Sequence, residues 1–331
     1  MIDFDVPEIG VALETVESGV ALGLEVRRAV AHDALQKEDR SPVTVADFSI
    51  QALVARRLQQ AFPRVPLVAE ERSDELRQPG HAAVCRQVLE WVSRFVDPGG
   101  REEVFGWIDH GASDPARRFW TLDPIDGTKG FLRGGHWAVC LALLEDHQVR
   151  LGVLGCPHWS AEVGWQAQGP GGLVLAVRGE GCWWRPLGGD EPLRPLQASG
   201  RDRPEDARIL RSYESGHTNE EQMERLVEEI GARADPVLMD SQAKYAALAA
   251  GQGDVLVRLL RPDKTGYKEK IWDQAAGSLV IQEAGGQVTD LDGRALDFST
   301  GRKLLNNRGI LASNGRLHQA CLQALQALQV A

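Results

Sequence analysis

A short apolar run at 119–122 ends in the string DPIDGT, which occupies residues 123–128. Proline fixes one backbone torsion angle and glycine admits left-handed conformations, so this string requires a strand that stops in a tight turn. Across the turn, Asp123 and Asp126 can face one centre, while Thr128 can open a helix whose N-terminus attracts phosphate oxygens. The string therefore predicts a metal and phosphate site. The alternative is an ordinary turn, because Asp, Pro and Gly favour turns for local reasons.

Further acidic residues stand where other strands or helices should begin or end. Glu70 and Glu71 follow an apolar strand expected at 65–69, Asp273 stands where a helix should begin, and Asp47 lies near the start of another expected helix. Hard cations such as Mg²⁺ need oxygen ligands, which a few carboxylates and a substrate phosphate can supply. Each acid also has a purely local explanation: a solvated strand end for the glutamate pair, an N-cap for Asp273, and a capping box at 44–47 for Asp47. Taken singly, the residues leave both explanations open.

Residues 1–200 combine helices with a middle part rich in strands. Apolar residues recur at helical intervals at 11–32, and again after 41–42 as far as Phe62. The polar segment 72–118 carries turn signals and one helical pattern, so we expect a mobile flap with a single helix there. Two hairpins should follow, pairing 137–144 with 149–156 and 173–177 with 182–184.

The pattern changes after a polar, proline-containing stretch at 197–206. Short strands then alternate with helices, so we divide the chain into subdomains 1–200 and 201–331. In the second subdomain we expect strands at 207–211, 236–239 and 254–259, a helix opening with a capping box at 218–221, a helix at 241–250, and a final helix from about 272 to the glycines at 285–286.

The composition excludes several classes of protein. The 331 residues include 37 basic and 47 acidic side chains, which gives a formal net charge of -10, and 43% of them are hydrophobic. Such a chain can bury a substantial core, and its acidity argues against nucleic acid as a partner. No apolar run is long enough to span a bilayer and the first residues are acidic, so we expect a cytoplasmic protein without membrane contact. The five scattered cysteines predict reduced packing residues.

Taken in order, the acidic sites resemble the motif of the lithium-sensitive, Mg²⁺-dependent phosphatase superfamily that includes the inositol monophosphatases. The residues that carry this resemblance, which extends over nearly the whole chain, are Asp47, Glu70-Glu71, DPIDGT at 123–128, Trp272-Asp273 and Gly285-Gly286. Within the superfamily, the chain is most similar to the 3′(2′),5′-bisphosphate nucleotidases. The strings that carry this closer likeness are SPVTVAD at 41–47, DPIDGTKGFL at 123–132, DSQAKY at 240–245 and YKEKIWD at 267–273. The resemblance implies an α/β fold, a layered αβαβα sandwich of the inositol monophosphatase and fructose-1,6-bisphosphatase type.

The resemblance also implies two or three Mg²⁺ ions and a set of ligands for them. Glu70, Asp123 and the backbone carbonyl of Ile125 would hold one ion. Asp123, Asp126 and Asp273 would hold a second, so Asp123 would bridge the two.

Three more residues receive roles in the same way. Glu71 would help to hold a third, weaker ion, and replacement of one Mg²⁺ by Li⁺ would account for lithium sensitivity. Asp47 and Thr128 would activate the attacking water, with Asp47 as its base. Such cations polarise phosphoryl oxygens and steady the leaving oxygen of an in-line displacement.

The substrate contacts implied by the resemblance are Gly127, Thr128, His217, Ser241, Lys244, Arg258 and Asp273. Lys244 and Arg258 would meet the 5′-phosphate that is not cleaved, a role that suits a point charge and a bidentate fork. The segment after Gly216 departs from the family pattern, because Glu220 stands where the family has a second histidine. This departure bears on how the adenine is held.

The activity implied is a phosphomonoesterase that converts 3′-phosphoadenosine 5′-phosphate to AMP and phosphate, with the sulfated precursor as a further substrate, in sulfur assimilation. Its partner would be a small phosphorylated molecule. Two alternatives stay open at this stage. The first is a phosphatase of inositol monophosphate, or of the 1-position of an inositol polyphosphate, because the same metal core would serve it. The second is a non-catalytic phosphonucleotide sensor on the same scaffold.

Overall fold

The computed structural model describes residues 6–33, 41–166, 169, 171–213, 220–259 and 266–329. Its α-helices are α1 (Pro7–Asp33), α2 (Ser41–Ala61), α3 (Ala82–Ser93), α4 (Arg101–His110), α5 (Thr128–Arg133), α6 (Glu220–Ile230), α7 (Ala243–Ala249), α8 (Ala275–Glu283) and α9 (His318–Ala327), and short 3₁₀ helices span Pro79–His81 and Pro204–Asp206. No helix in these ranges combines the length and the apolar character needed to cross a membrane.

Seven of the described strands form one sheet. In spatial order they are β1 (Leu67–Ala69), β2 (Arg118–Asp126), β3 (Ala138–Glu145), β4 (Gln148–Cys156), β7 (Gly172–Val177), β8 (Gly181–Pro186) and β9 (Arg194–Pro195). Only β1 and β2 pair in parallel within this sheet, and the other neighbours are antiparallel. The expected hairpins are confirmed as β3–β4 and β7–β8. A separate small hairpin joins β5 (Trp159–Ser160) and β6 (Gly164–Trp165).

Five further strands form a second sheet. In spatial order they are β11 (Val237–Leu238), β10 (Ile209–Arg211), β12 (Val255–Arg258), β14 (Ile310–Ser313) and β13 (Gln287–Thr289). The first three run parallel and β14 is antiparallel to both of its neighbours. The strands of the large sheet end by Pro195 and those of the second sheet begin at Ile209. The subdomain division at 200/201 itself stays a prediction.

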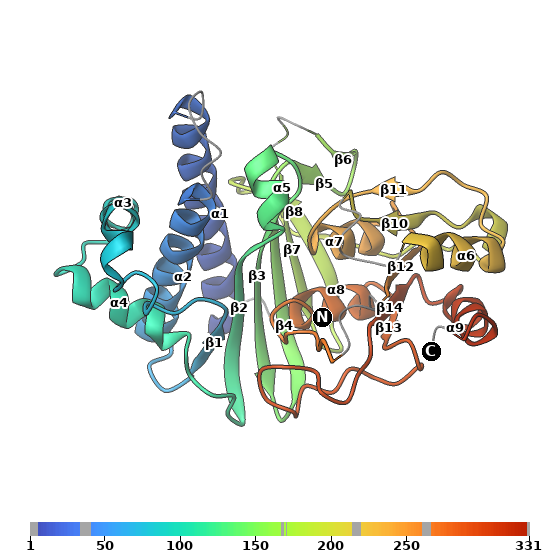
Figure 1. The fold of residues 1–331 in the computed structure, drawn as a ribbon. Helices are drawn as coiled ribbons and strands as arrows, with labels where there is room; N and C mark the ends of the chain where they lie inside the picture. Colours follow the sequence, from blue (N-terminus) through green and yellow to red (C-terminus); the bar gives the residue numbers. More distant parts are fainter. Residues whose placement is uncertain are drawn as a thin grey trace.

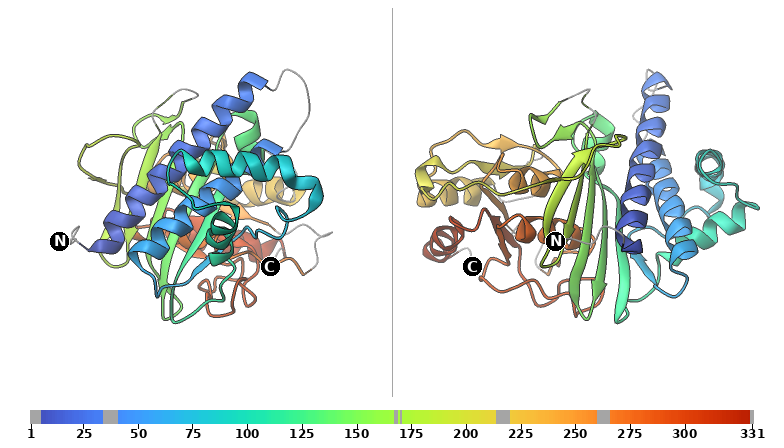
Figure 2. Two further views of the ribbon diagram at one scale, coloured as in Figure 1. Left: turned by 90° about the vertical axis from the view of Figure 1, so that its left-hand side faces the viewer. Right: turned by 180° about the vertical axis from the view of Figure 1, so that it is seen from behind.

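Side chains alternate across both sheets, and this alternation builds three apolar layers. In β3, Val139, Leu141 and Leu143 face α1 and α2, whereas Cys140 and Leu144 face the layer that contains α7 and α8. The second sheet closes that middle layer, and its outer face packs against α6 and α9. Figures 1 and 2 show the resulting order of helices, sheet, helices, sheet and helices. The expected αβαβα sandwich is confirmed.

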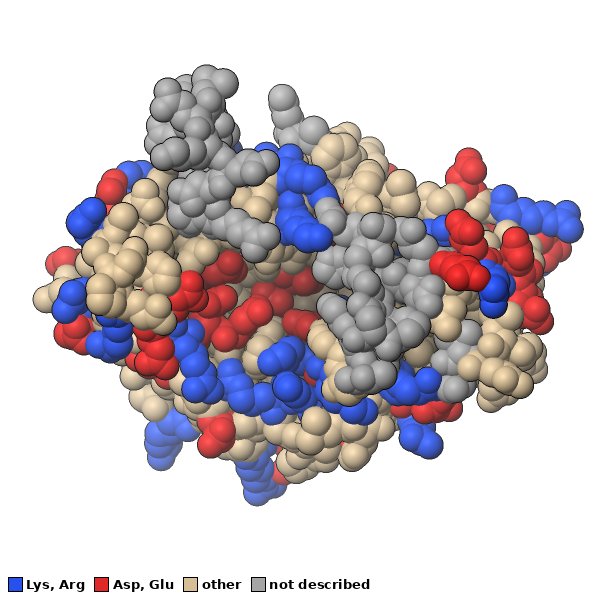
Figure 3. Space-filling view, in the orientation of Figure 1, with Lys and Arg blue, Asp and Glu red and all other residues tan. Residues whose placement is uncertain are grey.

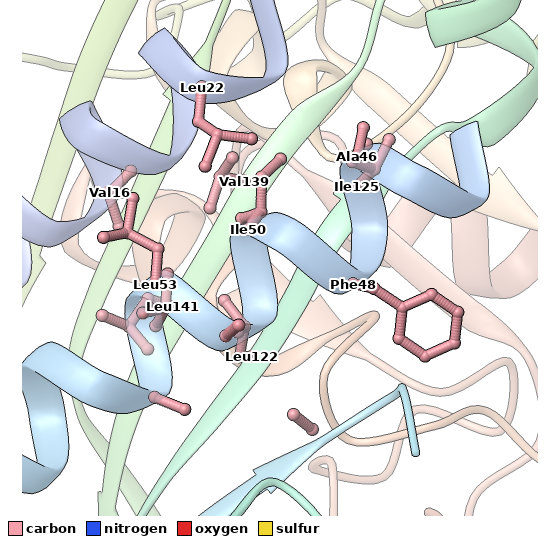
Figure 4. Packing of buried hydrophobic residues seen from close by; sticks show 14 of the residues in the cluster. Val16, Leu22, Ala46, Phe48, Ile50, Leu53, Leu122, Ile125, Val139 and Leu141 are labelled. Carbon is pink, nitrogen blue, oxygen red and sulfur yellow. The ribbon is translucent and has the colours of Figure 1, made fainter. Parts of the chain in front are cut away.

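The packing of α1 and α2 on the large sheet follows from their apolar spacing. Ile50 and Leu53 of α2 project toward β2 and β3, beside Val16 and Leu22 of α1 (Figure 4). All four side chains are buried. The five cysteines are also buried and unpaired, as the sequence predicts.

The helix expected in the segment 72–118 is confirmed as α3, but the expectation that it is the only helix there is wrong. The segment forms both α3 and α4, and each buries an apolar face that includes Val88 and Trp91 in α3 and Phe105 and Ile108 in α4. Both helices contact α2 and share its core cluster. The polar composition is that of their outer faces, and the Pro-Gly-Gly stretch at 98–100 separates two helices rather than ending one.

Other expectations need smaller corrections. Helix α8 begins at Ala275 and is not the final helix, because β13, β14 and α9 follow it. Its end is as expected, since Gly285 has a φ of 89°. The capping box proposed at 218–221 lies partly outside the described residues, and His217 lies wholly outside them.

Candidate active site

A cleft of about 840 Å³ lies where the C-terminal end of β2, the starts of α5, α7 and α8, and strands β10 and β12 meet. Figure 3 shows it as a hollow with acidic side chains in its floor and basic side chains on both rims. The sequence-predicted site residues that line it are Glu70, Asp123, Ile125, Asp126, Gly127, Thr128, Ser241, Lys244, Arg258 and Asp273. Residues from both halves of the chain therefore meet in one cavity, although the roles of the individual residues stay predictions.

The DPIDGT string forms the strand, turn and helix that its letters predict. The pairing of β2 with β3 shifts register between Asp123 and Asp126, which brings both carboxyl groups to the end of the strand. Gly127 then adopts a φ of 94° and precedes Thr128, the first residue of α5. A Cβ atom at Gly127 would lie 2.8 Å from the Cβ of Ser241, so only glycine lets the turn approach the start of α7.

The carboxyl groups of the cleft lie close together, and both burial and their mutual repulsion raise their pKa values. Asp123 is 2% exposed, and its Oδ1 has no hydrogen-bond partner. Burial raises the pKa of Asp123 well above its usual range, and the charges of Glu70, Asp126 and Asp273 raise it further. Burial likewise raises the pKa of Asp273, despite the opposing charge of Arg258. A cation would reverse these shifts and give the unpaired oxygen a partner, so the donor set fits a hard metal ion.

The described residues contain no group of three or more His, Cys, Asp or Glu side chains arranged to hold a metal by themselves. This finding is compatible with Mg²⁺, which usually keeps several waters and takes one or two carboxylates together with substrate phosphate. A closed cage made of protein ligands alone is therefore not required. The carboxylates of the cleft would supply the acidic ligands of such a site.

Glu70 and Glu71 leave β1 beside α2, and Gln51 of that helix holds the backbone of Glu71. The Gln51 Nε2 donates to the carbonyl of Glu71 at 2.7 Å, and the Glu71 N–H donates back to Gln51 Oε1 at 2.9 Å. Burial, with the charges of Glu70 and Glu75, raises the pKa of Glu71 to about 7. Glu71 is therefore fixed by the fold, whereas the side chain of Glu70 is exposed where it lines the cleft.

The structure does not support the helix-capping roles that were the alternatives for Asp47 and Asp273. Helix α2 begins at Ser41, so Thr44 and Asp47 lie inside it and form no capping box. Burial raises the pKa of Asp47 well above its usual range, followed by the charges of Glu71 and Glu70. Asp47 therefore lies next to the acidic cluster, although it does not line the cleft. The N-cap position of α8 belongs to Gln274, not to Asp273.

Two cations line the other side of the cleft. The Lys244 Nζ donates to Ser212 Oγ at 2.7 Å, and burial lowers the pKa of Lys244 to about 8, helped by the charge of Arg258. Two partly buried cations close enough to repel each other favour an anion between or beside them. Ser241, with a left-handed φ of 64°, starts the turn into α7, and its Oγ accepts from Ala243 N at 3.1 Å.

Several residues of the site had no role in the sequence-based interpretation. Gln242 donates from its backbone to Asp126 Oδ2 and from its side chain to the carbonyl of Trp272 at 3.0 Å. Glu269 and Tyr267 both contact Arg258. The only sequence signal for Gln51, which lies inside an otherwise apolar helical face, is its polarity. Glu269 lies within the string at 267–273 but carries no signal of its own.

Comparisons with known proteins agree with this geometry. The sequence profile of the Inositol monophosphatase family matches residues 5–329. The chain is 40% identical over 318 residues to the 3′(2′),5′-bisphosphate nucleotidase of Schizosaccharomyces pombe, covering 92% of this chain and 89% of that protein. It is 42% identical over 337 residues to the 3′(2′),5′-bisphosphate nucleotidase of Oryza sativa, covering 95% and 93%.

Solved structures share the fold at lower sequence identity. The Thermotoga maritima IMPase superimposes with a TM-score of 0.63 at 18% identity, covering 98% of this chain and 99% of that one. At that identity the likeness concerns the arrangement of helices and strands and not the substrate.

Proposed function

Since the chain belongs to the inositol monophosphatase family, we propose that it is an Mg²⁺-dependent phosphatase that removes the 3′-phosphate of 3′-phosphoadenosine 5′-phosphate. The names of the relatives in Schizosaccharomyces pombe and Oryza sativa support this substrate class. The observation that carries the proposal is the single cleft in which an acidic cluster faces Lys244 and Arg258. A substrate with two phosphate groups can place one beside the acids and the other beside the cations.

Glu70, Asp123, the carbonyl of Ile125, Asp126 and Asp273 are the residues that would hold two ions. When bound, Mg²⁺ supplies Lewis-acid polarisation of the phosphoryl oxygens and charge neutralisation. The unpaired Oδ1 of Asp123 and its raised pKa support this assignment. Glu71, next to Glu70, is the residue available for a third ion.

The hydrolysis proposed is a direct displacement by water. Asp47 accepts a proton from the water, and the Thr128 hydroxyl orients it. The water oxygen bonds to phosphorus as the bond between phosphorus and O3′ breaks, and O3′ takes a proton from solvent. The products are AMP and inorganic phosphate.

Substrate selection rests on the cationic side of the cleft. Lys244 and Arg258 bind the 5′-phosphate, and Gly127, Ser241 and Asp273 border the nucleoside. The proposal extends to the sulfated nucleotide as a second substrate, to inhibition by lithium and to a cytoplasmic role in sulfur assimilation. His217, a further proposed contact, lies outside the described residues.

The test measures phosphate release from 3′-phosphoadenosine 5′-phosphate, inositol 1-phosphate and inositol 1,4-bisphosphate in Mg²⁺ buffer, with and without a chelator. Lys244→Ala is assayed alongside the unaltered protein. We expect a strong preference for the nucleotide that collapses in the variant, and no turnover in the chelator. Preference for an inositol substrate, indifferent to Lys244→Ala, would refute the nucleotide assignment. Nucleotide binding without phosphate release in Mg²⁺ would identify a sensor.

A further inference from the structure

Arg258 is held from two sides by residues of the segment 266–273. Its Nε lies 2.9 Å from Oε1 of Glu269, and its Nη2 donates to the Tyr267 hydroxyl at 3.0 Å. The side chain of Glu269 is 3% exposed, whereas that of Arg258 is 34% exposed and lines the cleft. The carboxylate is therefore inside the protein, and the guanidinium bridges from it to the substrate cavity.

Glu269 is in turn fixed by a chain of hydrogen bonds. Gln274 donates from Nε2 to Glu269 Oε2 at 3.0 Å, and the Tyr245 hydroxyl donates to Gln274 Oε1 at 2.5 Å. Tyr245 and Gln274 are both buried. The position of the carboxylate is thus set by Tyr245, which follows Lys244 in α7, and by Gln274, which follows Asp273 and precedes α8.

Burial disfavours the charged form of the Glu269 carboxyl group, yet the chain has an ionisable residue at this position. Removal of Glu269 from water raises its pKa even though Arg258 opposes the shift. Buried ion pairs often contribute little net stability compared with apolar residues of similar size, so stability alone is a weak reason for such a pair. A guanidinium has five donors in a fixed fork, so Arg258 can form an ion pair with Glu269, donate to the Tyr267 hydroxyl and still present donors to a phosphate.

We infer that Glu269 is a positioning residue for substrate selection: it sets the orientation of Arg258, with help from Tyr267, so that the guanidinium meets the phosphate of the nucleotide that is not hydrolysed. This inference rests on the proposed function. It assigns discrimination between a 3′,5′-bisphosphate and a 3′-monophosphate to the ion pair of Arg258 and Glu269. Glu269 itself touches neither the reacting phosphate nor the acidic cluster in this account.

The experiment compares 3′-phosphoadenosine 5′-phosphate with 3′-AMP, which lacks the 5′-phosphate. We would measure kcat and KM for both in Mg²⁺ buffer with the unaltered protein, Glu269→Gln and Tyr267→Phe. The matched control is Asp254→Asn, which removes another buried carboxylate, paired with Arg201 at 2.9 Å and absent from the cleft lining. Circular dichroism and thermal unfolding establish that each variant is folded.

For Glu269→Gln we expect KM for the bisphosphate to rise about tenfold or more, because a charge-assisted contact is lost, with kcat within about threefold of the unaltered protein. The ratio of kcat/KM for the bisphosphate to that for 3′-AMP should fall by the same factor. Tyr267→Phe should lower the ratio in the same direction, by about threefold, because only one hydrogen bond is removed. Asp254→Asn should leave the ratio unchanged. If the role of Glu269 were purely structural, Glu269→Gln would lower kcat/KM for both substrates by the same factor.

An unchanged ratio in folded Glu269→Gln, or an equal fall in Asp254→Asn, overturns the inference. If Glu269→Gln does not fold, Tyr267→Phe decides in its place.

A second experiment measures the affinities of AMP and adenosine by calorimetry and does not depend on turnover. If the unaltered protein hydrolyses neither nucleotide, the proposed function fails, yet a loss of AMP affinity of about tenfold in Glu269→Gln, without loss of adenosine affinity, would still support the role of Glu269. Equal AMP affinity in the two proteins would refute it.

Discussion

The side-chain amide of Gln51 closes a two-bond ring with the backbone of Glu71. One bond runs from Gln51 Nε2 to the Glu71 carbonyl at 2.7 Å, and the other from the Glu71 N–H to Gln51 Oε1 at 2.9 Å. The same Nε2 also donates to the carbonyl of Ile108 in α4, at 2.8 Å. One fully buried side chain of α2 thus ties the acidic end of β1 to the α4 segment.

Replacing Gln51 should weaken metal binding. Gln51→Leu keeps the size of the side chain but leaves the buried backbone groups of Glu71 without partners, which costs about 1–3 kcal/mol for each unsatisfied group. The acidic segment should then lose its fixed position, and the Mg²⁺ concentration for half-maximal activity should rise about tenfold. Magnesium titration by calorimetry and by phosphate release measures this. Gln252→Leu is the control, because Gln252 makes similar bonds to Trp159 and Ser160 away from the cleft. An unaltered Mg²⁺ requirement in folded Gln51→Leu would contradict the prediction.

Asp47→Asn tests the proposed base. The carboxamide has nearly the same shape but accepts no proton, so kcat should fall at least about a hundredfold, in line with the usual contribution of a general base. Magnesium affinity should change little, because Asp47 is not among the proposed ligands. Activity near that of the unaltered protein would leave Asp47 without a catalytic role, and the structure already excludes the capping box that would otherwise explain it.

Gly130→Ala should destabilise the protein. A Cβ at Gly130 would stand 1.9 Å from the backbone carbonyl oxygen of His136, which cannot move without displacing the chain after α5. We expect a loss of about 1–3 kcal/mol in the free energy of unfolding, typical of overpacking, together with a lower kcat because Thr128 lies in the same short helix.

The control is Gly106→Ala in α4, where an added Cβ meets nothing within 4 Å. Alanine in an exposed helical position is favoured over glycine by about 0.5–1 kcal/mol, so this variant should be as stable as the unaltered protein or more so. Urea unfolding of the two variants distinguishes the results. Equal stability of both would show that the space around Gly130 can relax.

The sequence predicts best those features whose causes are local. The turn at 123–128 is specified by its own proline and glycine, and the exit from α8 at Gly285 by the need for a left-handed residue. The α4 helix was missed because its short apolar face, with Phe105 and Ile108, is hidden among charged residues. Its burial depends on α2, which lies some fifty residues earlier in the chain.

Two other omissions have different causes. The spacing of Leu317, Cys321 and Leu325 is helical and could have revealed α9, since all three are buried on one side. Glu269 could not have been found in this way. Its function depends on contacts with Arg258 and Gln274, which tertiary folding brings together, and a lone acidic residue in a polar string has no distinguishing pattern.

His318 should contribute a loss of stability in mild acid. This imidazole is 2% exposed and lies 3.0 Å from both Thr289 Oγ1 and Ser313 Oγ. Burial lowers its pKa to about 4, whereas an imidazole in the unfolded chain titrates near 6.5. Below pH 6.5 this residue therefore binds more protons in the unfolded state than in the folded state, so the contribution of His318 to the free energy of unfolding should decrease by up to about 3 kcal/mol between pH 6.5 and pH 4.

Urea unfolding at several pH values between 7.5 and 4.5 measures this effect by difference. His318→Gln should be less stable at pH 7.5, because its contacts with Thr289 and Ser313 are altered, but its stability should decline less steeply on acidification than that of the unaltered protein. His147→Asn is the matched variant: it removes an exposed imidazole, and asparagine tolerates the φ of 63° at that position. Its curve should run parallel to that of the unaltered protein. If the His318→Gln curve is equally parallel, groups other than His318 account for the acid sensitivity.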